Sequence, residues 1–157
     1  MSYKQIHEAL RVGVVGYSGR KFDEAIARRE LSEVLNELLE QRELPPSQVE
    51  LVSGLTNIGV PKIAYEIAAE AGMKTVGISA ARALSSSVGV YAVDKQIIVG
   101  ENYGDESEEF IGYIDVLIRI GGGDQSLGEV EMFKRRFEAD EASLSNCLFE
   151  VDLPELD

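Results

Sequence analysis

The sequence has no tryptophan, one cysteine, one histidine, and only 15 lysines and arginines against 28 aspartates and glutamates in 157 residues. The lone Cys147 excludes an intramolecular disulfide. The lone His7 excludes Ser-His-Asp triads and Cys/His metal clusters, so we expect no metal site. The net charge of −13 argues against nucleic acid as a partner, because phosphate-backbone binding needs a basic surface. It argues equally against an anionic membrane surface.

Long apolar runs are also missing, and none approaches the ~20 residues that span a bilayer. The N-terminal segment lacks the apolar core of a signal peptide, which, with the single cysteine, predicts a cytoplasmic protein. A content of 45% hydrophobic and 27% charged residues is typical of one globular domain. We expect a lead-in over residues 1–10, a single domain over 11–151, and an acidic tail over 152–157 that frays.

Apolar segments alternate with amphipathic ones along the chain. Strands are predicted at 11–17, 49–53, 74–79, 95–100, 114–120 and 147–151. Helices are predicted over 23–41, from Pro61 to a cap at Gly72, and over 127–137, where Leu127, Val130, Phe133 and Phe137 would be buried. This alternation predicts an α/β fold with three layers, in which helices cover both faces of a doubly wound parallel sheet.

Glycine-rich loops follow three of the predicted strands, at residues 16–22, 53–62 and 121–129. Ligands of such sheets bind beyond the carboxyl ends of the strands, where glycine lets backbone N–H groups approach an anion. Arg20, Lys21 and Lys62 would make the local potential positive and suited to phosphate. The candidate binding residues of the first two loops are Gly16, Ser18, Gly19, Arg20, Gly54, Asn57, Gly59 and Lys62. The alternative is that these glycines only shape tight turns.

A nicotinamide dehydrogenase is disfavoured by the first loop. Gly13, Gly16 and Gly19 form G-x-x-G-x-x-G, which differs from the dinucleotide-binding G-x-G-x-x-G. The second strand ends in Ser53 and Gly54, where a ribose-binding carboxylate would be expected. We therefore predict no bound cofactor.

Three stretches together resemble the SLOG superfamily of Rossmann-like proteins, and within it the LOG ("lonely guy", lysine-decarboxylase-like) proteins. They read VGVVGYSGRKF, LVSGLTNIGVPKIAYEIAAEAGMKTVGIS and YIDVLIRIGGGDQSLGEVEMF, and the likeness spans roughly residues 11–137. The family pattern P-G-G-x-G-T-x-x-E falls on Gly121, Gly122, Gly123, Asp124, Gln125, Ser126 and Glu129. The resemblance implies that the glycines and Ser126 hold a 5′-phosphate, and that Glu129 assists cleavage of an N-glycosidic bond. Ser126 and Glu129 also have the spacing of a helix capping box, a purely structural alternative.

The family's catalytic arginine has no counterpart in this sequence. Its position falls among residues 103–106, and no basic residue occurs between Lys95 and Arg119. Strand alternation would place the side chain of Arg119 on a face of the sheet. The leading hypothesis is therefore binding of a nucleotide or nucleotide-derived phosphorylated ligand. The alternatives are a nucleoside 5′-monophosphate phosphoribohydrolase and a non-binding structural homologue. The resemblance also implies a homodimer or higher homo-oligomer.

Overall fold

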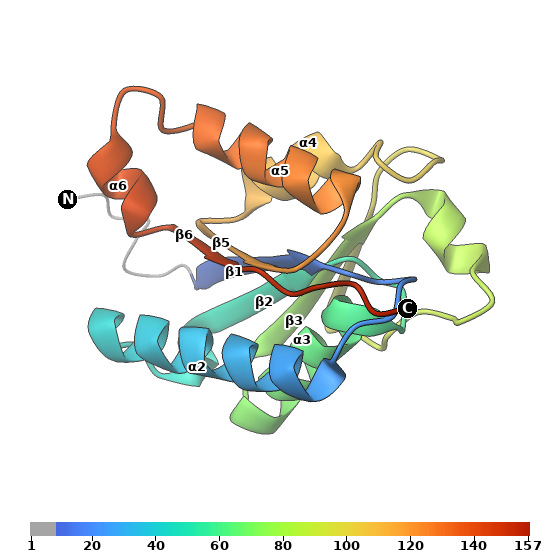
Figure 1. The fold of residues 1–157 in the computed structure, drawn as a ribbon, viewed down its shortest axis with the longest axis horizontal. Coiled ribbons are helices and arrows are strands. Elements are labelled where there is room, and N and C mark those ends of the chain that lie inside the picture. The colour runs from blue at the N-terminus through green and yellow to red at the C-terminus, as the bar shows by residue number, and fades with distance from the viewer. Residues whose placement is uncertain (1–8) are drawn as a thin grey trace.

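The computed structural model describes residues 9–157, so His7 and most of the expected lead-in lie outside the described residues. Six parallel strands form one sheet in the order β4-β3-β2-β1-β5-β6 (Figure 1). Their bounds are Leu10–Gly16 (β1), Val49–Ser53 (β2), Lys74–Ser79 (β3), Lys95–Ile98 (β4), Val116–Ile120 (β5) and Leu148–Val151 (β6). The strand order reverses between β1 and β5, which places a topological switch point at the carboxyl ends of these two strands.

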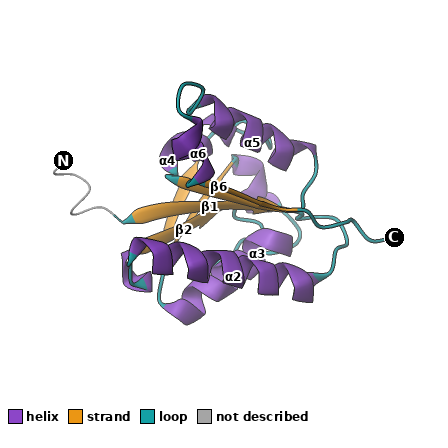
Figure 2. Ribbon diagram, turned by 60° about the vertical axis from the view of Figure 1, so that its left-hand side comes forward, coloured by secondary structure: helices purple, strands orange, loops and turns teal. Residues whose placement is uncertain are grey.

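Helices cover both faces of the sheet, which confirms the predicted three-layer α/β architecture (Figures 1 and 2). One face carries α2 (Glu24–Arg42) and α3 (Gly59–Ala71). The other carries α4 (Ser107–Tyr113) and α5 (Asp124–Arg135), while α6 (Glu141–Ser145) leads into β6. Short 3₁₀ turns at Pro46–Gln48 and Ala81–Ser85 complete the described secondary structure.

Each layer of helices has its own apolar core. Leu31 and Leu35 of α2 and Ile63 of α3 pack on one side of the sheet. Phe110 of α4 and Phe133 of α5 pack on the other. The apolar periodicity of the sequence therefore predicts which faces are buried, because each helix contributes a single stripe to its core.

Helix α5 differs from the prediction, since it begins at Asp124 and not at residue 127. Its buried residues are Ser126, Glu129, Val130 and Phe133. Leu127 lies about 100° away from Ser126 around the helix and is 46% exposed, so its predicted burial is wrong.

The C-terminal segment packs onto the domain, so the prediction that it frays is also wrong. Leu153 is buried, and its carbonyl oxygen accepts a hydrogen bond from the Tyr17 hydroxyl at 2.9 Å. The backbone N–H of Leu156 donates to the carbonyl oxygen of Lys21 at 2.8 Å. These contacts hold the segment along the loop that follows β1.

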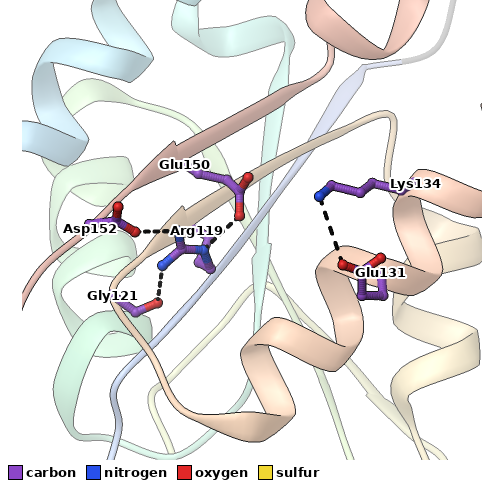
Figure 3. A network of polar contacts seen from close by, with 6 residues as sticks. All are labelled: Arg119, Gly121, Glu131, Lys134, Glu150 and Asp152. Carbon is purple, nitrogen blue, oxygen red and sulfur yellow. Dashed lines mark hydrogen bonds and ion pairs between the residues drawn. The ribbon is translucent and has the colours of Figure 1, made fainter. Parts of the chain in front are cut away.

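The side chain of Arg119 on β5 binds the start of this segment (Figure 3). Its buried guanidinium donates to Glu150 at 2.9 Å, to Asp152 at 2.7 Å and to the carbonyl oxygen of Gly121 at 2.9 Å. Arg119 therefore organises β6 and the turn after β5, and these contacts direct its charge toward the C-terminal segment.

The helices of residues 9–157 lack the combination of length and apolar character that crossing a membrane requires. In the same part of the chain, no group of three or more His, Cys, Asp or Glu side chains is placed to hold a metal ion.

Candidate functional site

A cavity of about 690 Å³ lies at the carboxyl edge of the sheet, over the switch point. Its walls come from the loop after β1, from the end of β2 and the loop that follows it, and from the end of β3. Tyr103, Glu106 and Phe110 close one side, and the first turn of α5 closes another. The fold thus brings segments from all three predicted glycine loops into one site.

Most of the residues predicted from the sequence meet at this cavity. Those that line it are Gly16, Ser18, Gly19, Arg20, Gly54, Gly123, Ser126 and Glu129. The others, which are outside the lining, are Asn57, Gly59, Lys62, Gly121 and Gly122. Gly121 and Gly122 border a separate hollow of about 460 Å³ beside Arg119 and Leu127.

Several of these glycines have a packing role that requires no ligand. A Cβ on Gly16 would lie 2.3 Å from the carbonyl oxygen of Ile120, closer than real contacts allow. Gly122 has a φ of +103°, and a Cβ there would lie 2.7 Å from Ser126. At these positions the turn-shaping interpretation is sufficient.

Gly19 and Gly123 are different, because a Cβ built on either would meet nothing within 4 Å. Both line the cavity, and Gly123 has an extended φ of −101° that any residue can adopt. Neither packing nor backbone conformation therefore requires glycine at position 123. Absence of a side chain leaves open space at the helix start, which suits a bound group.

The amino end of α5 faces this open space without a side-chain cap. Its N-cap residue is Gly123, and no side chain accepts from the first turn. The capping-box alternative is therefore wrong: Ser126 lies inside the helix, and its hydroxyl is 3.4 Å from the carbonyl oxygen of Gly16. Uncapped N–H groups and the helix dipole favour an anion at this position.

The charge around the cavity is not the positive one that the sequence suggested. Of the described residues that line it, Arg20 alone is cationic, whereas Asp124, Glu106 and Glu129 are acidic. The guanidinium of Arg20 is 2.9 Å from the carboxylate of Glu155, and its side chain is 62% exposed. Lys62 is exposed and outside the cavity lining. The expectation of three cooperating basic residues is therefore wrong.

Two buried glutamates line the cavity. Glu106 and Glu129 are each 7% exposed. The hydroxyl of Ser107 donates to Glu129 at 3.0 Å, and the amide of Gln125 donates to Glu106 at 3.4 Å. The backbone N–H of Gly104 donates to the other oxygen of Glu106 at 2.8 Å.

Burial raises the pKa of the Glu129 carboxyl to about 7. The neighbouring charge of Glu106 raises this pKa further, while hydrogen bonds from Ser107 and Gln125 oppose the rise. Glu129 therefore changes its protonation state close to neutral pH.

Sequence reasoning missed Glu106, Ser107 and Gln125 as members of the site. Residues 105–109 are acidic apart from Ser107, a composition that is typical of a solvated helix start, and α4 begins there at Ser107. Glu108 and Glu109 are exposed, but Glu106 turns inward against α5. The available signals were that Gln125 replaces a glycine of the family pattern and that Glu106 falls within the stretch 103–106, where the family's arginine would be expected.

Comparison with known proteins identifies the fold. No protein-family model matches the chain, and no curated protein sequence matches it significantly. A molybdenum cofactor binding protein from the phototrophic bacterium Rippkaea orientalis is 20% identical, with a TM-score of 0.65 over 94% of this chain and 92% of that one.

Two further structures are similar. The molybdenum cofactor carrier protein of Chlamydomonas reinhardtii is 21% identical, with a TM-score of 0.64 over 93% of this chain and 91% of that one. The structural-genomics target TM1055 is 24% identical, with a TM-score of 0.55 over 81% of this chain and 69% of that one. The chain therefore shares the three-layer, Rossmann-like α/β fold of these proteins.

Proposed function

We propose that this protein binds a phosphorylated small molecule, a nucleotide or a nucleotide-derived compound, in the cavity at the switch point. The observation that carries the proposal is the uncapped amino end of α5 at Gly123, in a cavity that Gly19 also lines and that no side chain of either glycine fills. A phosphate there would accept hydrogen bonds from first-turn N–H groups and from the hydroxyls of Ser18 and Ser126. Arg20 would add charge once it leaves Glu155.

Binding without cleavage is favoured over hydrolysis by the charge beside Glu129. The stretch 103–106, in which the family's catalytic arginine would be expected, ends in Glu106, and the carboxylate of Glu106 is 3.4 Å from the Gln125 amide. A second carboxylate there opposes a phosphate or a developing negative charge and supplies no electrophilic help. Two structural neighbours are a molybdenum cofactor carrier protein and a molybdenum cofactor binding protein, so this cofactor is tested as a ligand together with the nucleotides.

A phosphoribohydrolase remains the second candidate, supported by the buried Glu129 in the cavity. An acid with a pKa near 7 can protonate a leaving base at neutral pH. This activity predicts release of free base from a nucleoside 5′-monophosphate.

We also propose that the protein is cytoplasmic and forms a homo-oligomer. Measurement of its molecular mass in solution would test the oligomeric state.

A thermal-shift screen tests the binding proposal. Nucleoside mono-, di- and triphosphates, pterin-type compounds and the molybdenum cofactor are each added to the full chain, and free-base release is assayed for every hit. We expect at least one ligand to raise the Tm by several degrees, because binding at 100 times its Kd stabilises by about 2.7 kcal/mol.

A pair of glycine variants locates the site. Gly123→Val puts a branched side chain at the helix start and should weaken binding at least 10-fold. It should lower stability by less than about 1 kcal/mol, since valine is a poorer N-cap than glycine. Gly128→Val, on the same helix but outside the cavity lining, should bind as the wild type does. Equal binding by both variants, or no stabilising ligand at all, would overturn the proposal.

A further inference from the structure

Glu106 and Gln125, which are distant in the sequence, meet in space. Glu106 lies at the start of α4 and Gln125 in the first turn of α5, and the Gln125 amide is 3.4 Å from the Glu106 carboxylate. Glu129, the residue that keeps its place in the pattern, lies one helical turn beyond Gln125 on α5. Residues from two distant segments of the chain thus form one polar cluster on a wall of the cavity.

Glu129 lies farther along α5 than the proposed phosphate position. Glu129 is five residues beyond Asp124, or about 7.5 Å along the axis of α5. Phe110 lines the cavity beside it, and Arg20 and Gly19 belong to the loop that follows β1. A ligand with its phosphate on the amino end of α5 would therefore extend its other end toward Glu106 and Glu129.

We propose, resting on the function proposed above, that Glu106, beside Glu129, selects a base with adjacent N–H donors, the ring N–H and the 2-amino group of guanine or a pterin. Both glutamates are more than nine-tenths buried and both line the cavity. An ionised carboxylate only accepts hydrogen bonds. Each oxygen of Glu106 accepts one hydrogen bond within the protein, so a further lone pair remains on each.

The geometry of the base edge gives the discrimination. The ring N–H and the 2-amino group of guanine or a pterin point in the same direction and can bond both oxygens of one carboxylate. Adenine presents an amino group beside a ring nitrogen that is itself an acceptor, so one carboxylate oxygen would face another acceptor. A buried polar group left without its partner disfavours the wrong ligand strongly.

Affinities of GMP, IMP and AMP for the full chain test this inference, because IMP differs from GMP only by lacking the 2-amino group. Isothermal titration should give GMP at least a 10-fold tighter Kd than IMP, and AMP should bind more weakly than GMP. In a parallel pair, 6-hydroxymethylpterin phosphate should bind at least 10-fold tighter than the corresponding lumazine, which has oxygen in place of the 2-amino group. The tighter of GMP and the pterin phosphate identifies which source of this edge the cavity prefers.

Glu106→Gln tests the residue directly. Glu108→Gln is its matched control, because Glu108 is exposed in the first turn of α4, two residues after Glu106. Glu106→Gln should reduce the preference for GMP over IMP to less than about 3-fold, whereas Glu108→Gln should keep it. If Glu106→Gln does not fold, the affinities of the wild-type protein for GMP, IMP and AMP test the inference by themselves. Equal affinity for GMP and IMP, together with equal affinity for the pterin and the lumazine, overturns the inference and leaves the proposed function standing. Tighter binding of AMP than of GMP also overturns the inference and leaves the proposed function standing. Failure of every phosphorylated ligand to bind overturns both.

Discussion

Replacing Glu129 with glutamine should raise the free energy of unfolding at pH 8 by about 3 kcal/mol and change it little at pH 4. In the folded protein the pKa of this carboxyl is about 7, against an ordinary value of 4.5. The folded state therefore keeps a proton that the unfolded state loses between these pH values. The contribution of the protonated group is fully present below pH 4.5 and is lost as the pH rises through about 7. Glutamine is neutral at every pH and avoids this loss.

Urea unfolding of the wild type and Glu129→Gln at pH 4, 6 and 8 measures the effect. Glu131→Gln is the control, because Glu131 lies on the same helix, is 63% exposed and is 3.8 Å from Lys134 (Figure 3). That pair is a solvated i,i+3 contact worth a few tenths of a kcal/mol at most. If Glu129→Gln raised the free energy of unfolding at pH 8 no more than Glu131→Gln does, Glu129 would not be buried and desolvated as described.

Gly16→Ala should destabilise the protein by about 3 kcal/mol and lower its Tm by about 6–12 °C. Gly16 pairs with Ile120 at the end of the β1–β5 ladder, and a new Cβ would lie 2.3 Å from that residue's carbonyl oxygen. Val60 of α3 blocks it as well, at 2.7 Å. Since the clash is with backbone in the sheet, a side-chain rotation cannot relieve it.

Gly19→Ala is the matched control for this variant, three residues later in the same loop. A Cβ there meets nothing within 4 Å, so we expect a stability change below about 0.5 kcal/mol. Guanidinium unfolding of both variants makes the comparison. A Gly16→Ala protein as stable as Gly19→Ala would show that the loops at this edge are not packed as described.

The sequence was sufficient to predict the fold class because each element carries its own periodic signal. The strands at 49–53 and 74–79 and the cap at Gly72 are observed where the pattern placed them. The packing of the C-terminal segment was not predictable in the same way. It depends on Tyr17 and Arg119, which are more than thirty residues distant from Leu153 and Asp152 in the chain.

The sequence predicted the location of the site, because loops after parallel strands meet at one edge of the sheet. It did not predict the side chains whose positions depend on tertiary contacts. Loops after parallel strands converge on one edge, so the glycines after β1 and β5 could be expected near one another. Lys62 was misplaced because α3 buries Val60, Pro61 and Ile63 and turns the intervening lysine outward. The inward position of Glu106 depends on the packing of α4 against α5, which no local pattern encodes.

A crystal structure with the ligand that stabilises the protein most tests the central claim most directly. The account predicts a phosphate against Gly19, Gly123 and the first turn of α5, with the rest of the ligand reaching toward Glu106 and Glu129. A ligand bound elsewhere, for example in the hollow beside Arg119 and Leu127, would contradict it.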